Sequence, residues 1–107
     1  MAATPPLSSV LIAEDSPETL AMLADAVEAA GYIAMVALRG DRALSIARQA
    51  TPDVILLDAV MPGLDGFETC RQLKRDGALS RVPVIFMTGL SDPGDIVRGL
   101  EAGGVDY

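Results

Sequence analysis

The stretch Val54-Ile55-Leu56-Leu57-Asp58 is an unbroken apolar run that ends in a carboxylate, and the turn-forming stretch Met61-Pro62-Gly63-Leu64-Asp65-Gly66 follows it closely. Four consecutive aliphatic residues between turn-forming residues are typical of a strand that is buried on both faces. A carboxylate at the mouth of such a strand is poorly solvated, which costs stability. We therefore expect the charge of Asp58 to have a function.

A second acidic site ends another apolar run, because Val10-Leu11-Ile12-Ala13 leads directly into Glu14-Asp15. The next residues, Ser16-Pro17-Glu18, have the composition of a helix start: a Ser cap, Pro at the first helical position and an acid in the first turn. Two strands that each end in acidic residues suggest one shared pocket.

The rest of the chain alternates predicted strands and helices. Predicted strands cover residues 10–13, 32–37, 54–57 and 84–87, residues 105–107 start a fifth, and predicted helices begin at Pro17, Gly40, Phe67 and Asp92. This alternation predicts an α/β fold with a parallel sheet and right-handed crossovers. We expect one domain over residues 8–107, preceded by a mobile lead-in at residues 1–7.

The composition excludes several classes of function. Half of the 107 residues are hydrophobic, but with two Phe, two Tyr and no Trp the core must be aliphatic. A net charge of −7 argues against direct binding of nucleic acid or of an anionic membrane. The absence of His excludes a His-based acid or base, and Cys70 alone forms neither a disulfide nor a zinc site. We see no signal peptide and no membrane span, so we expect a cytoplasmic protein.

The acidic residues are expected to converge. Ligands of open α/β sheets bind beyond the carboxyl ends of the strands, where the strand order reverses. If the order is 2-1-3-4-5, strands 1 and 3 are neighbours there, which brings Glu14, Asp15 and Asp58 together, with Thr88 after strand 4 beside them. Two like charges ~4 Å apart repel by ~4 kcal/mol at an effective dielectric of ~20, so either a carboxyl takes up a proton or a cation binds. Oxygen ligands alone favour Mg²⁺, with Mn²⁺ or Ca²⁺ as alternatives.

Each of these residues also has a structural interpretation. Asp15 precedes Ser16-Pro17 and so competes as a helix cap, Glu14 could be a solvated side chain, and Thr88 could be an ordinary strand residue. We interpret Asp65 as a structural residue that serves the turn before Gly66.

The chain resembles the receiver domain of two-component response regulators. The resemblance covers residues 8–107 and rests on five short motifs in the family's order and at its usual spacing, namely Glu14-Asp15, Asp58, Met61-Pro62-Gly63-Leu64-Asp65-Gly66, Met87-Thr88-Gly89 and Gly104-Val105-Asp106-Tyr107. It implies a flavodoxin-like doubly wound parallel sheet with strand order 2-1-3-4-5.

The resemblance also implies a role for each matching residue. Asp58 would be the phosphoacceptor, a carboxylate nucleophile that forms an acyl phosphate. Asp15 would bind Mg²⁺ directly, Glu14 would bind it through water, and the backbone carbonyl of Val60 would be a further ligand.

Thr88 would hydrogen-bond the phosphoryl group, and Tyr107 would be the aromatic switch that reorients with Thr88. The donor would be a sensor histidine kinase or a phosphotransfer protein, and the receiver would act on a downstream output domain or protein as a switch rather than as an enzyme.

The sequence departs from the family at its end. Family members carry a Lys-Pro pair shortly after the fifth-strand aromatic, whereas this sequence stops at Tyr107. We expect a fragment of a longer receiver in which strand 5 and the last helix are largely missing. Strand 4 would then be an exposed apolar edge, so that dimerisation through the side of strand 4 and helix 4 is possible.

Two other functions compete with the phosphorylated switch. One is a receiver-like interaction module that binds partners without phosphorylation, which the absent Lys favours. The other is an Asp-nucleophile phosphatase. Such enzymes usually carry a second acid two residues after the nucleophile, where this chain has Val60.

Overall fold

The structure is a computed structural model, and it describes residues 8–58, 61, 63 and 65–87. It contains four strands and three helices within these residues: β1 (Ser9–Ala13), α1 (Pro17–Ala29), β2 (Ile33–Ala37), α2 (Gly40–Ala50), β3 (Val54–Leu57), α3 (Gly66–Arg75) and β4 (Val84–Phe86). The predicted lead-in, the helix from Asp92 and the start of a fifth strand lie outside the described residues.

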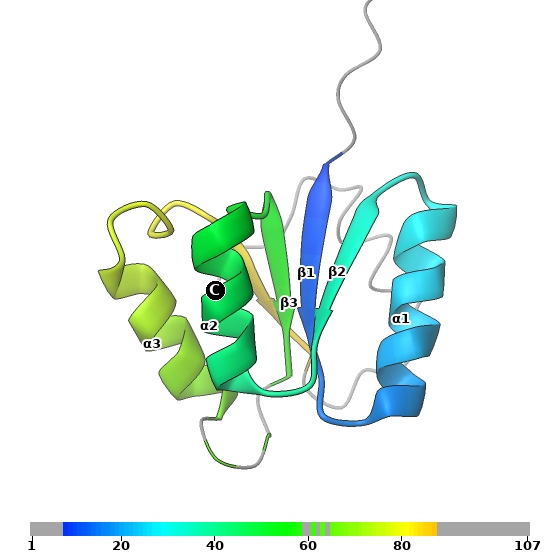
Figure 1. The fold of residues 1–107 in the computed structure, drawn as a ribbon, viewed down its shortest axis with the longest axis horizontal. Helices are drawn as coiled ribbons and strands as arrows, with labels where there is room; N and C mark the ends of the chain where they lie inside the picture. Colours follow the sequence, from blue (N-terminus) through cyan, green and yellow to red (C-terminus); the bar gives the residue numbers. More distant parts are fainter. Residues whose placement is uncertain (1–7, 59–60, 62, 64, 88–107) are drawn as a thin grey trace, which may run out of the picture.

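The strands form one parallel sheet in the order β2-β1-β3-β4, which confirms the predicted α/β class and the order of its first four strands. The register aligns the carboxyl ends of the two central strands, because Ala13 of β1 lies opposite Leu57 of β3. Helix α1 covers one face of the sheet, and α2 and α3 cover the other (Figure 1). Acids that follow β1 and β3 therefore emerge at the same edge.

The core is aliphatic and divided by the sheet into two clusters. Alternate residues of β1 and β3 point to opposite faces, as the period of a strand requires. On the α1 side, Val10 and Leu56 pack with Leu23 of the helix. On the other side, Leu11 and Leu57 pack among residues of α2 and α3. Because both faces are buried, β1 and β3 have continuous apolar sequences.

The helix starts follow their sequences. Ser16 caps α1 by accepting a hydrogen bond from the Thr19 N–H, and Pro17 is the first helical residue. Ser16 therefore does the capping that Asp15 was considered for. The apolar composition of α1 favours burial of Met22 in or near the core, which is wrong: Met22 is 47% exposed because it lies off the helix face that Leu20 and Leu23 bury. None of the described helices has the length and apolar character needed to cross a bilayer.

Candidate functional site

Three carboxylates meet at the carboxyl ends of β1 and β3. One carboxylate oxygen from each of Glu14, Asp15 and Asp58 lies within 4.8 Å of the others. The backbone fixes this arrangement, since the Asp58 N–H donates to the Ala13 carbonyl at 3.0 Å and the Glu14 N–H donates to the Ala37 carbonyl at 3.0 Å. The predicted convergence of these acids is therefore confirmed as geometry.

The carboxyl group of Glu14 has a strongly raised pKa. The pKa of Glu14 is raised to about 7, with burial as the largest cause; a hydrogen bond from the Ser16 N–H opposes the shift, and the neighbouring Asp15 and Asp58 add to it. That N–H donates to Glu14 Oε2 at 2.8 Å. Glu14 is thus half-buried and held by the backbone rather than freely solvated, which excludes its interpretation as an ordinary exposed acid.

The donor set of the cluster fits a hard divalent cation. Its ligand atoms are carboxylate oxygens, and the chain has no His to favour a transition metal. Asp15 is exposed while Glu14 and Asp58 are half-buried, so the cluster opens to solvent on one side. Mg²⁺ retains several waters and binds substrate phosphate, and an open cluster of this kind leaves room for both.

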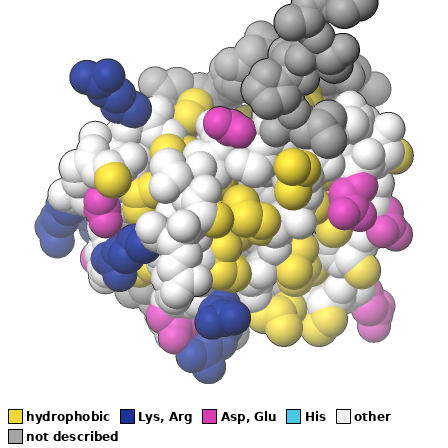
Figure 2. Space-filling model, turned by 45° about the horizontal axis from the view of Figure 1, so that its top comes forward, with side chains coloured by type: hydrophobic (Ala, Val, Ile, Leu, Met, Phe, Trp, Pro, Cys, Tyr) yellow, Lys and Arg dark blue, Asp and Glu magenta, His cyan; other side chains and the backbone are white. Residues whose placement is uncertain are grey.

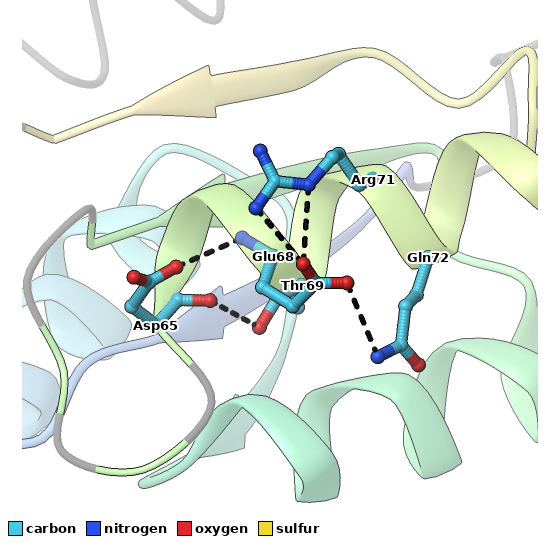
Figure 3. Close-up of polar contacts among 5 residues, drawn as sticks. All are labelled: Asp65, Glu68, Thr69, Arg71 and Gln72. Atoms are coloured by element: carbon cyan, nitrogen blue, oxygen red, sulfur yellow. Dashed lines mark hydrogen bonds and ion pairs between the residues drawn. The ribbon is translucent and has the colours of Figure 1, made fainter.

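Asp65 forms the N-cap of helix α3, which is the next helix after Asp58 in the sequence. Asp65 caps the helix by accepting a hydrogen bond from the Glu68 N–H at 2.8 Å, and Thr69 Oγ1 donates to the Asp65 carbonyl at 2.7 Å (Figure 3). Glu68 also pairs with Arg71 on the next turn at 2.8 Å. The structural role predicted for Asp65 is confirmed, and among the described residues Asp65 is not part of the carboxylate cluster.

Three predicted site residues, Val60, Thr88 and Tyr107, lie outside the described residues. Among the described cations, Lys74 is engaged by backbone carbonyls of its own region of the chain. Its Nζ donates to the carbonyls of Ser80 at 3.3 Å and Val82 at 2.8 Å, near the end of α3 that is remote from Asp58. Within the described part of the chain, the carboxylate cluster contains no acid that the sequence failed to indicate.

Comparison with known families decides what kind of domain carries this site. The family model for the response regulator receiver domain matches residues 10–107. The chain belongs to the response regulator receiver domain family. The accepting of a phosphoryl group and the binding of Mg²⁺ at an acidic pocket are typical of this family, and the three carboxylates of this receiver domain form a group that could hold such an ion.

Individual relatives agree with the family assignment. The receiver domain is 40% identical over 101 residues to Protein PilH of Pseudomonas aeruginosa, covering 94% of this chain and 84% of PilH. It is 39% identical over 98 residues to the response regulator PleD of Caulobacter vibrioides, covering 92% of this chain but only 22% of PleD. The chain thus spans about a fifth of the length of PleD.

Solved structures share the fold. A signal receiver domain of a histidine kinase from Syntrophus aciditrophicus matches with a TM-score of 0.74 and 40% identity, covering 94% of this chain and 76% of that one. The N-terminal domain of a response regulator receiver protein from Methanoculleus marisnigri JR1 matches with a TM-score of 0.77 and 29% identity, covering 94% and 82%. The α/β architecture of this receiver domain is therefore that of its relatives.

Proposed function

We propose that this receiver domain, spanning residues 8–107, accepts a phosphoryl group on Asp58 in a Mg²⁺-dependent reaction and thereby switches a downstream output. The observation that carries the proposal is the meeting of the Glu14, Asp15 and Asp58 carboxylates within 4.8 Å at the rim of the sheet. Such a concentration of negative charge is unfavourable unless a cation or a proton compensates it.

Asp58 is the proposed nucleophile because it is the half-buried carboxylate at the end of the central strand β3. One of its oxygens would attack the phosphorus of the donor, forming an acyl phosphate as the bond from phosphorus to the leaving group breaks. The leaving group keeps the electron pair of that bond. The donor proposed is a phosphohistidine on a sensor kinase or phosphotransfer protein, and the absence of His from this chain agrees with a donor outside it.

Asp15 and Asp58 would hold Mg²⁺ directly, together with the Val60 carbonyl, and Glu14 would hold it through water. When bound, the ion neutralises the charge that develops on the phosphoryl oxygens. Glu14 serves this site best when ionised, and its raised pKa makes the proton a competitor of the metal. In this proposal Thr88 hydrogen-bonds the phosphoryl group, and the Tyr107 side chain reorients when Thr88 moves.

The proposal is tested with a small-molecule phosphodonor such as acetyl phosphate. In the presence of Mg²⁺, intact-protein mass spectrometry should show the addition of one phosphoryl group, and a chelator should prevent it. Asp58→Asn should abolish the addition. Asp53→Asn is the matched control, because Asp53 lies at the opposite end of β3, and it should leave the addition in place.

Two results would overturn the proposal. Addition of phosphate to Asp58→Asn would place the acceptor elsewhere. No addition to the unchanged chain, with either acetyl phosphate or a phosphorylated kinase domain, would instead favour the interaction module that binds partners without phosphorylation.

A further inference from the structure

The open edge of the sheet at β2 is a surface that the proposed phosphoryl chemistry does not use. Among the described strands, β2 ends the sheet on its side, between the layer of α2 and the layer of α1 (Figure 1). Hydrophobic side chains gather over it (Figure 2). Ile33 is 48% exposed, and Val36 and Leu38 are each 45% exposed. Apolar side chains concentrated at an open sheet edge are a feature of binding surfaces.

The backbone of β2 has hydrogen-bonding groups aimed at this edge. The Ile33 N–H donates to the Ser8 carbonyl at 2.9 Å, and the Ala37 carbonyl accepts from Glu14 at 3.0 Å, so Ile33 and Ala37 point toward β1. The N–H and C=O groups of one residue share a side of the strand, and this side alternates along the chain. Ala34 and Val36 therefore direct theirs outward, where an added strand would pair with them.

A groove at the carboxyl end of β2 adds chemical selectivity to the edge. It has a volume of about 620 Å³, and its apolar wall includes Leu20, Val36 and Leu38. Arg39 and Arg42 also line the groove, and Arg39 pairs with Asp41 at 2.6 Å. The lining residues therefore sum to one positive charge on a chain whose overall charge is −7. A carboxylate on a bound segment would be attracted to Arg42 on the α2 side of the groove, away from the acids that follow β1.

The charges of α1 argue against a second copy of the chain as the occupant. In a symmetric dimer that continues the sheet, the two β2 strands must pair antiparallel. In a symmetric parallel pair, Ala34 and Val36 of one copy would lie opposite the same residues of the other copy, and their outward N–H and C=O groups would not form inter-strand hydrogen bonds. The antiparallel pair places α1 of both copies on the same face. Helix α1 carries Glu18, Asp25 and Glu28 and no Lys or Arg, so the two helices would repel.

We infer that the β2 edge binds an extended segment of another protein as an added strand. The segment is apolar at alternate positions, to contact Ala34 and Val36 on the α1 face of the strand, and acidic at the end that reaches Arg42. The inference does not depend on phosphorylation of Asp58, and the Asp58→Asn variant should bind the segment as the unchanged chain does.

Synthetic peptides test this inference. The probes are acetyl-Val-Thr-Val-Thr-Val-Asp-Glu-amide and a peptide of the reversed sequence, because the added strand can be parallel or antiparallel to β2. In the matched control peptides two Lys replace the Asp and the Glu. One acidic probe should shift the backbone amide resonances of Ala34 and Val36 and slow their hydrogen exchange. Arg42→Glu should weaken that probe about tenfold and strengthen its Lys counterpart, as reversal of a charge at an interface rim predicts.

The control variant is Arg75→Glu, an equally drastic change at an exposed site on α3, and it should leave the affinity unchanged. The inference is overturned if neither acidic probe perturbs Ala34 and Val36, if the Lys peptides bind equally well, or if both Arg variants weaken binding alike. A dimer in sedimentation velocity that Val36→Lys dissolves would assign the edge to a second copy and also overturn it.

Discussion

Two aspartates bound β3: Asp53 precedes its first residue, and Asp58 follows its last. Asp53 is exposed and accepts hydrogen bonds from Ser9 N at 2.8 Å and Ser9 Oγ at 3.3 Å, so it ties the start of β3 to the start of β1. Asp58 is half-buried and shares its space with Glu14 and Asp15. The same residue type is stabilised by donors at one end of the strand and crowded by like charges at the other.

The parallel sheet explains the contrast. At the amino edge, the first residue of β1 presents an N–H group to the acid of its neighbour. At the carboxyl edge, β1 and β3 both lead into acids, and the register brings these acids level. An acid at the amino edge therefore stabilises the fold, whereas acids at the carboxyl edge cost stability unless a proton or a cation compensates their charge.

The largest expected effect is the pH dependence of stability without metal. Because the pKa of Glu14 rises from its ordinary 4.5 to about 7 on folding, the folded state binds this proton more tightly than the unfolded chain. This contribution to stability is complete below about pH 4.5 and is lost as the pH rises through about 7, with a slope of at most about 1.4 kcal/mol per pH unit.

Urea denaturation at several pH values, in a chelator, measures this slope. Glu14→Gln should flatten the dependence between pH 5 and pH 7 relative to the unchanged chain, and Asp53→Asn should preserve it. Equal slopes for the Glu14→Gln variant and the unchanged chain would show that Glu14 titrates normally.

The second effect concerns the amino edge. Asp53→Ala removes the Oδ2 that accepts both Ser9 hydrogen bonds and should lower the free energy of unfolding by about 1–2 kcal/mol. Ser9→Ala removes only the hydroxyl partner and should cost less. Urea titrations at constant pH measure both changes, and an unaltered midpoint for Asp53→Ala would mean that the tie between β1 and β3 contributes nothing.

A similar but smaller loss is expected at the start of α3. Asp65→Ala removes the cap that accepts from the Glu68 N–H, which should cost about 1 kcal/mol. Asp65→Asn retains a capping oxygen and should lose much less, so comparison of the two variants by thermal unfolding isolates the cap. If both variants were equally destabilised, the negative charge rather than the hydrogen bond would be responsible.

The smallest expected change has the opposite sign. Asp58→Asn removes one of three crowded charges and should stabilise the metal-free protein by about 0.5 kcal/mol, a modest value because the site is open to solvent. Denaturant titration in a chelator at pH 7.5 measures it. A clear loss of stability would mean that Asp58 contributes more to the fold than its repulsion removes.

Much of this fold could be predicted from local patterns. Continuous apolar runs identified β1 and β3, and Ser16-Pro17 located the start of α1. The convergence of Glu14, Asp15 and Asp58 followed because parallel strands align their carboxyl ends, which is a rule of topology rather than of any one residue.

Other features depend on neighbours that the sequence does not reveal. The tie between Ser9 and Asp53 joins residues 44 positions apart, so Asp53 resembled an ordinary turn residue. The exposure of Ile33 and Val36 follows from the place of β2 at the edge of the described sheet, because an apolar edge strand has the same composition as a central one. The pKa of Glu14 likewise depends on burial that only the assembled fold produces.

We propose that the acids at the carboxyl edge form a cation site to which the acid at the amino edge does not contribute. Titration of Mg²⁺ by isothermal calorimetry at pH 7.5, on the unchanged chain and on three variants, tests it most directly. We expect one bound ion in the unchanged chain, lost in Asp15→Asn and Asp58→Asn and retained in Asp53→Asn. Equal Mg²⁺ affinity in all four proteins would show that these carboxylates do not form a cation site.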